Sequence, residues 1–115
     1  MQPGKVNFNA PQGSTFTRTL VYKVDSVAVD LTGYSARMQV RKSVTDSSTL
    51  LSLSTDTGEI VITGSTGTIT ITINATSMSS ISAGNWVYDL EIVSSGGVVT
   101  RLIEGRFIVT PEVTR

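Results

Sequence analysis

The sequence contains neither cysteine nor histidine among its 115 residues. Without cysteine the chain has no disulfide, no thiolate nucleophile and no cysteine-bound zinc. Without histidine it lacks the side chain that most often acts as a general base and that titrates near neutral pH. The two absences remove the commonest routes to catalysis and to zinc binding. We therefore expect no enzymatic activity, no catalytic residue, no cofactor and no metal site.

An excess of charge of one sign is also lacking. Nine Lys and Arg residues balance nine Asp and Glu residues. A nucleic-acid ligand needs a concentrated positive field, and the basic residues here are scattered, so we expect no nucleic-acid partner. No apolar run approaches the roughly 18 residues of a membrane-spanning helix. Residues 1–14 also lack the apolar core of a signal peptide. We expect no membrane partner, and synthesis in a cytosol without a cleaved export signal.

Period-two alternation is the dominant pattern that the sequence does contain. Isoleucines alternate with threonines over residues 68–73, and large apolar residues occupy every second position over residues 86–92. Such alternation, bounded by glycine and serine, is typical of half-buried antiparallel strands. Turn signals recur at a spacing that predicts about seven to nine short strands. The predicted fold is all-β, an immunoglobulin-like antiparallel β-sandwich, with a small closed barrel or jelly roll as the alternative.

Three places depart from simple alternation. Met78 and Ile81, three positions apart, predict a single helical turn that closes one end of the sandwich. Arg18 falls on the apolar face of its strand, which indicates either a position near the strand end or a bulge. Gly105 interrupts the last strand, where glycine is typical of a bulge, a bend or a close backbone approach. We expect the strand to switch sheets or partners there. The side chains expected to share a face before this glycine are Val99, Arg101 and Ile103.

The predicted domain organisation is one sandwich over residues 13–115, preceded by an extended arm over residues 1–12. In the arm, Val6 and Phe8 lie on one face of an edge strand bracketed by two prolines. An arm of this kind can add a strand to the sheet of a neighbouring protein. Deletion of residues 2–11 is therefore expected to leave the fold nearly intact and to abolish docking.

Asp89 and Glu91 are the carboxylates that invite a chemical interpretation, because they lie two apart on one strand face. Paired carboxylates serve acid–base catalysis and metal binding. On a strand they are more often part of a solvated face, paired across strands with a cation. We favour the second interpretation, with Arg37, Arg41 or Arg101 as partner. The serines have no histidine base and no Gly-x-Ser-x-Gly turn.

Glycine pairs and aromatic residues also have two interpretations each. Gly64–Gly67 and Gly96–Gly97 precede strand-like runs, which favours hairpin turns over phosphate cradles. Trp86, Tyr88 and Tyr34 either line a carbohydrate site or belong to the core. Their alternating spacing favours the core. If Trp86 and Tyr34 were exposed on one face, the carbohydrate interpretation would gain.

Several segments together resemble a group of small tailed-phage structural proteins. They extend over nearly the whole chain. The segments are Gly13–Phe16, Asp30–Tyr34, Ala36–Arg41, Gly84, Val87–Glu91, Arg101–Gly105 and Val109–Arg115. The pattern is similar to the N-terminal domain of phage baseplate upper proteins.

This resemblance implies an immunoglobulin-like assembly module on a virion made in the host cytoplasm. The implied partners are other virion proteins, namely capsid, neck, tail or baseplate subunits, with many copies on the particle. The residues expected to dock are Val6 and Phe8 in the arm and Pro111, Val113 and Arg115 in the C-terminal tail. A carbohydrate- or receptor-binding β-sandwich module of the virion is the alternative function.

Overall fold

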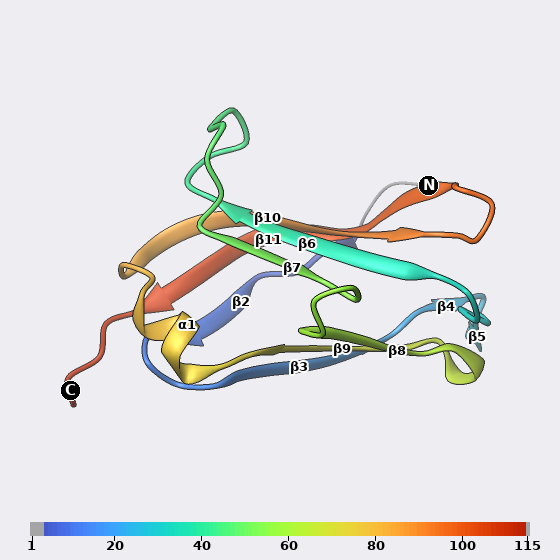
Figure 1. Cartoon of the computed structure of the whole chain (residues 1–115), viewed down its shortest axis with the longest axis horizontal. Coiled ribbons are helices and arrows are strands. Elements are labelled where there is room, and N and C mark those ends of the chain that lie inside the picture. The colour runs from blue at the N-terminus through green and yellow to red at the C-terminus, as the bar shows by residue number, and fades with distance from the viewer. Residues whose placement is uncertain (1–3, 115) are drawn as a thin grey trace.

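The computed structural model describes residues 4–114, which are largely β-strand. The strands are β1 (Gly4–Lys5), β2 (Phe8–Pro11), β3 (Phe16–Val21), β4 (Lys23–Val24), β5 (Val27–Ala28), β6 (Ser35–Arg41), β7 (Leu51–Ser54), β8 (Ile60–Thr63), β9 (Thr68–Ile73), β10 (Gly84–Val93) and β11 (Val99–Thr110). A 3-10 turn, η1 (Gly64–Thr66), and one short helix, α1 (Ala75–Ser79), complete the chain. Two sheets lie one above the other (Figure 1).

The sheet topology is that of an immunoglobulin-like sandwich. The large sheet has the order β1-β11-β10-β6-β7, with β2 also paired to β11, and the small sheet has the order β3-β9-β8. An immunoglobulin fold places its C, F and G strands in one sheet and its B, E and D strands in the other. Strands β6, β10 and β11 correspond to C, F and G, and β3, β9 and β8 correspond to B, E and D. The predicted fold class is confirmed.

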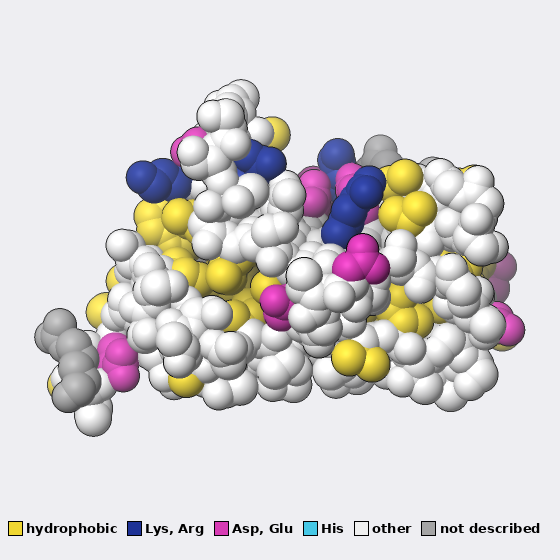
Figure 2. All heavy atoms as spheres, in the orientation of Figure 1, with side chains coloured by type: hydrophobic (Ala, Val, Ile, Leu, Met, Phe, Trp, Pro, Cys, Tyr) yellow, Lys and Arg dark blue, Asp and Glu magenta, His cyan; other side chains and the backbone are white. Residues whose placement is uncertain are grey.

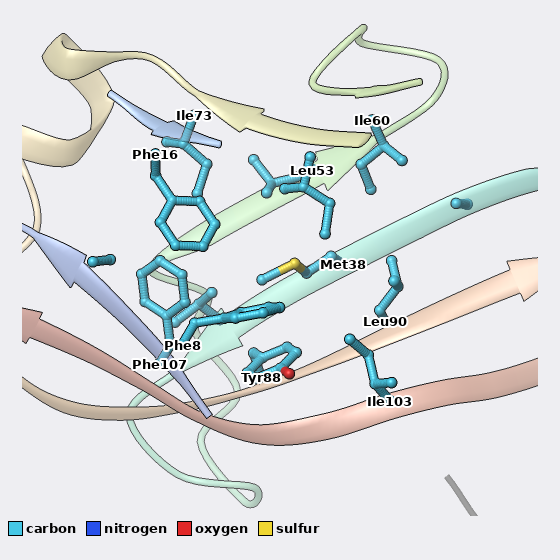
Figure 3. Packing of buried hydrophobic residues seen from close by; sticks show 14 of the residues in the cluster. Phe8, Phe16, Met38, Leu53, Ile60, Ile73, Tyr88, Leu90, Ile103 and Phe107 are labelled. Atoms are coloured by element: carbon cyan, nitrogen blue, oxygen red, sulfur yellow. The ribbon is translucent and has the colours of Figure 1, made fainter. Parts of the chain in front are cut away.

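The core lies between the two sheets and is supplied by alternate residues of their strands. The inward positions of β6, β9 and β10 are almost completely buried, and β11 contributes four further buried residues. Phe8, Phe16, Phe107 and Tyr88 form an aromatic group at one end of the core (Figure 3). Burial of such side chains is the main source of stability. The residues that alternation places inward are Ala36, Met38, Val40, Ile69, Ile71, Ile73, Leu90 and Ile92.

Helix α1 closes one end of this core, as the Met78–Ile81 spacing predicts. The Asn74 side chain accepts a hydrogen bond of 2.8 Å from the Ser77 N–H, which satisfies a free amide at the start of the helix. Met78 is fully buried and Ile81 is 3% exposed. A single helical turn therefore fills the gap that neither sheet covers.

The N-terminal segment is part of the sandwich, which corrects the prediction of a separate arm. Strand β2 pairs with β11 in parallel, and Phe8 and Ala10 are buried in the core. The Tyr88 hydroxyl donates a 2.6 Å hydrogen bond to the Val6 carbonyl oxygen. Deletion of residues 2–11 would remove this buried surface, so the expectation that the fold would survive it disagrees with the structure. The alternation of Val6 and Phe8 is compatible with a strand packed in the sandwich as well as with a free arm, so the sequence pattern could not distinguish the two.

Gly105 marks the place where β11 changes its neighbour, as predicted. Residues 103 and 104 pair with β1, and residues 107–110 pair with β2. A Cβ atom at Gly105 would lie 2.1 Å from the Val6 carbonyl oxygen, so only glycine allows the N-terminal segment to cross here. The predicted close backbone approach is confirmed.

A bulge in β11 falls slightly earlier than this glycine and changes which side chains face the core. The register between β10 and β11 shifts so that Leu90 lies opposite Ile103 while Glu91 lies opposite Arg101. Leu102 is the extra residue, and it is buried beside Ile103. The expectation that Arg101 and Ile103 share a face is therefore wrong, because the bulge turns Arg101 outward.

Candidate docking surfaces

The predicted docking residues of the N-terminal segment are held inside the molecule. Phe8 is 4% exposed and stacks on Tyr88 with ring centroids 4.8 Å apart. Val6 is partly buried, and its N–H donates to the Glu104 carbonyl oxygen over 3.0 Å. Docking through Phe8 is therefore incorrect for this fold, because its side chain has no free surface to offer.

The C-terminal segment is different, because its predicted docking residues lie at the surface. Pro111 is exposed, and Val113 is 92% exposed. The Glu112 N–H donates to the Gln12 side-chain oxygen over 3.2 Å, which fixes the segment just before Val113. Figure 1 shows this end of the chain leading away from the sandwich. Arg115 lies outside the described residues.

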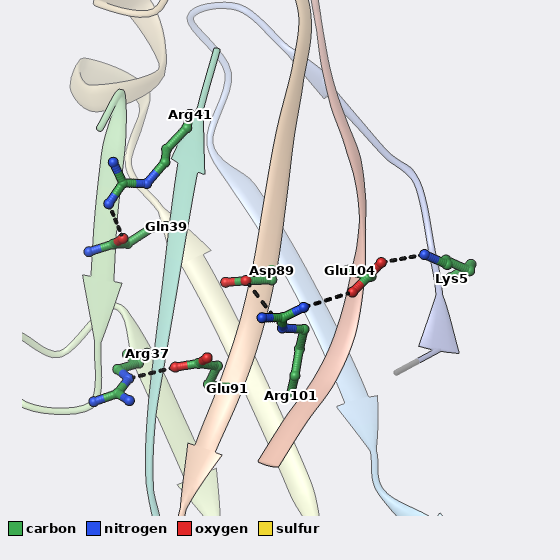
Figure 4. A network of polar contacts seen from close by, with 8 residues as sticks. All are labelled: Lys5, Arg37, Gln39, Arg41, Asp89, Glu91, Arg101 and Glu104. Atoms are coloured by element: carbon green, nitrogen blue, oxygen red, sulfur yellow. Dashed lines mark hydrogen bonds and ion pairs between the residues drawn. The ribbon is translucent and has the colours of Figure 1, made fainter. Parts of the chain in front are cut away.

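The outer face of the large sheet carries most of the ion pairs and is called the charged face here. Arg37 Nε contacts Glu91 Oε1 at 2.8 Å, and Arg101 Nε lies 3.5 Å from Asp89 Oδ2 (Figure 4). Glu104 continues the network, since it pairs with both Arg101 and Lys5. The interpretation of Asp89 and Glu91 as members of a solvated, arginine-paired face is confirmed.

A hollow of about 500 Å³ opens on the charged face between β6, the loop that follows it, and β11. Burial raises the pKa of the Asp89 carboxyl, and the neighbouring Glu91 carboxylate raises it further, while Arg101 opposes both effects. Arg41 lies on the opposite side, where it donates to the Gln39 side-chain oxygen and the Asp46 carbonyl oxygen, both over 2.8 Å. Side chains of both charges line the hollow, so its electrostatic potential does not favour an anionic ligand over a cationic one.

The aromatic residues do not form a carbohydrate platform. Tyr88 is buried, and Trp86 and Tyr34 are both partly buried against the core. Trp86 also donates its indole N–H to the Ser82 carbonyl oxygen over 3.0 Å. Trp86 lies near the start of β10 and Tyr34 lies beyond its far end, so about 27 Å of strand separates them. No single sugar ring can stack on both.

Arg18 covers the open side of the aromatic core. Its guanidinium carbon lies 4.5 Å from the centroid of the Phe16 ring, a cation–π distance. It also donates to the Thr17 carbonyl oxygen over 2.8 Å and to the Asn9 carbonyl oxygen over 3.0 Å. Arg18 therefore links β3 of the small sheet to β2 of the large sheet. The strand is regular there, which excludes the bulge and leaves the other alternative, a position near the start of β3.

The free edge of β3 is a surface that the sequence did not reveal. The Tyr22 N–H donates a 2.8 Å hydrogen bond to the Gly67 carbonyl oxygen, directly after the last residue of β3. In an antiparallel pair every second residue bonds to the partner strand, so the even-numbered residues of β3 are those that bond to β9. The main-chain groups of Thr17, Thr19 and Val21 therefore point away from β9. We call this row the open edge. Alternation in the sequence indicates which side chains share a face of the sheet, and it does not indicate which strand lies at an edge. The open edge could therefore be identified only from the strand order.

Residues 4–114 contain no cluster of side chains suited to metal binding. No group of three or more Asp, Glu, His or Cys side chains converges there to hold a metal ion. Among the same residues, no helix has the length and apolar character needed to cross a membrane.

Comparison with known proteins finds a distant similarity to a solved structure and no matching family model. No protein-family model matches the sequence, and no curated protein matches it. Among solved structures, the chain is similar to CopC from Methylosinus trichosporium OB3b, with a TM-score of 0.48 and 14% identity over 97% of this chain and 89% of that one. A likeness at this level carries no argument about function.

Proposed function

We propose that this chain is a non-enzymatic structural protein of a tailed-phage virion, an immunoglobulin-like assembly module that docks on capsid, tail or baseplate subunits. The resemblance of its segments to small phage structural proteins supports the virion role. Those segments also have defined structural tasks in the sandwich. In the Asp30–Tyr34 turn, for example, Asp30 accepts hydrogen bonds from the Thr32 N–H and hydroxyl, and Leu31 is buried.

The observation that carries the docking proposal is the C-terminal segment after β11. Its start is anchored by the hydrogen bond between Glu112 and Gln12, and its next side chain, Val113, is an almost fully exposed valine. A short segment held in position loses little conformational entropy when a partner covers it. An exposed apolar side chain at such a position gains hydrophobic free energy on docking.

The experiment uses phage particles assembled in a host strain that carries the gene for this chain, either as wild type or as a variant. Protein mass spectrometry of purified particles measures how much of each variant is incorporated. We expect wild-type protein in the particles and roughly tenfold less Val113→Asp protein, because burying an unpaired carboxylate exceeds the ~1.4 kcal/mol that a tenfold change requires. The matched control is Val27→Asp, since Val27 is 67% exposed on the β4–β5 hairpin at the other end of the molecule.

Two results would contradict different parts of the proposal. Absence of the wild-type protein from purified particles would overturn the virion role. Presence of wild-type and Val113→Asp protein in equal amounts would retain the virion role and reject the C-terminal segment as the docking element.

A further inference from the structure

We propose that the open edge of β3 pairs with the same edge of a second copy of this chain, in antiparallel orientation, with Thr19 on the two-fold axis. The pairing joins the two small sheets into one continuous sheet across two molecules. This inference concerns self-association and does not depend on where the protein acts.

The open edge is the longest unpaired strand edge among the described residues. Strand β3 has six residues, whereas the edge strands β7 and β8 have four each. Proteins usually protect such edges with short strands, charges, prolines or covering loops. On β7, the Ser54 N–H is occupied by the Glu59 carboxylate at 3.4 Å, and β2 ends in Pro11. Strand β3 has no proline and no bulge.

Protection on β3 is confined to one end. Arg18 covers the Thr17 carbonyl oxygen with a 2.8 Å hydrogen bond. The main-chain groups of Thr19 and Val21 have no partner within residues 4–114. The edge therefore offers donors and acceptors in the alternating pattern that an added strand requires.

A second copy fits because the row is self-complementary. A two-fold axis at Thr19 pairs Thr19 with itself and Thr17 with Val21 of the other copy. All three residues whose main-chain groups point outward then lie in hydrogen-bonded pairs. The Thr17 carbonyl oxygen accepts from Val21 of the other copy in addition to Arg18, because a carbonyl oxygen has two lone pairs. A two-fold axis at Thr17 or Val21 would leave some of the outward main-chain groups of β3 without a hydrogen-bond partner. On the outer face, the side chains opposite each other in this register are all β-branched, which favours antiparallel pairs.

Charge also favours the second copy. The outward side chains of β3 are Thr17, Thr19 and Val21, all exposed and all uncharged. The neighbouring outward positions of β9 are threonines, so no like charges meet across the axis. On the inner side, Arg18 lies opposite Leu20 of the other copy. Figure 2 shows that on the face drawn, Lys and Arg side chains gather over the upper layer, away from the small sheet.

The first test measures the mass of the full chain in solution over a range of concentrations by sedimentation equilibrium. We expect a reversible dimer for the wild type and a monomer for Thr19→Lys, because the axis would bring two lysine charges together. Thr19→Pro is expected to be monomeric as well, since it removes an N–H that the monomer does not use. The control Thr70→Lys places the same charge on the adjacent strand and should remain dimeric.

The second test reads the register by disulfide formation, which the natural absence of cysteine makes simple. In a hydrogen-bonded antiparallel pair the Cα atoms lie about 5.5 Å apart, within disulfide range. Thr19→Cys should therefore cross-link on mild oxidation. Val21→Cys should not, because its two copies would lie roughly 14 Å apart along the strands.

Three results would overturn the inference. They are a wild-type chain that stays monomeric up to millimolar concentration, a Thr19→Lys variant that still dimerises, and equal cross-linking of the two cysteine variants. If the first result is found, and the monomer binds phage particles through a contact that Thr19→Lys disrupts, the edge pairs with a strand from another protein.

Discussion

Replacement of Phe8 by alanine tests whether the N-terminal segment belongs to the core. Phe8 is 4% exposed, and its ring lies 4.8 Å from that of Tyr88 and 5.5 Å from that of Phe16. Truncation of a buried phenylalanine to alanine costs about 3–5 kcal/mol of unfolding free energy, through lost transfer energy and the cavity left behind. Because a domain of this size has a total stability of about 5–15 kcal/mol, this loss is a large fraction of it.

The assay is equilibrium unfolding in urea, followed by tryptophan fluorescence and circular dichroism, with thermal unfolding beside it. At about 4 °C for each kcal/mol, the melting temperature should fall by about 12–20 °C. Val113→Ala is the control, since this 92% exposed side chain should change stability by no more than about 0.5 kcal/mol. A loss below about 1 kcal/mol for Phe8→Ala would refute the reasoning and restore the free arm. Deletion of residues 2–11 should abolish cooperative unfolding.

Further predictions concern the contacts around this segment and one turn. Gly105→Ala should destabilise by about 1–3 kcal/mol or more, because its Cβ would meet the Val6 carbonyl oxygen at 2.1 Å. Gly96→Ala should be neutral in the same urea assay, because its Cβ would meet only the Ser94 hydroxyl at an ordinary contact distance of 3.9 Å. Tyr88→Phe should cost about 1 kcal/mol by removing the hydrogen bond to Val6, and amide exchange at Val6 should accelerate; unchanged exchange would argue against that bond. The hydrogen bond from the Thr32 hydroxyl, and to a smaller extent the one from the Thr32 N–H, lower the pKa of the Asp30 carboxyl below its ordinary value of 3.8. The ionised Asp30 carboxylate therefore stabilises the fold above pH 3.8, and this stabilisation is lost as the pH falls through the folded-state pKa. Asp30→Asn should therefore lose less stability than the wild type between pH 7 and pH 3, and equal losses in urea titrations at the two pH values would contradict the assignment.

Alternation along the chain was enough to predict the fold class and the inward faces of the central strands. The isoleucines of β9 and the apolar positions of β6 are buried as their period-two spacing predicts. Gly105 also indicated the change of strand partner correctly, because a glycine inside a strand pattern weakens the strand and is kept where another backbone segment comes close.

Features that depend on pairing across the sheet were not accessible from the sequence. Val6 and Phe8 alternate in the same way whether their strand is free or inserted, so burial could not be read from the pattern. The bulge at Leu102 reverses the faces before Gly105 without any glycine or proline to mark it. The open edge at Thr19 exists because the N-terminal segment joins β11 and leaves β3 without a second neighbour.

The placement of β2 beside β11 has a consequence for how the molecule is made. Phe8 pairs with Phe107, and the Tyr88 hydroxyl reaches back across 82 residues to Val6. Contacts so distant along the chain form slowly, because a large loop must close before they contribute. During synthesis, Phe8 and Ala10 stay without their partners until β11 has left the ribosome. Strand β2 is thus made early and covered late, and its apolar side chains are open to aggregation until β11 is in place.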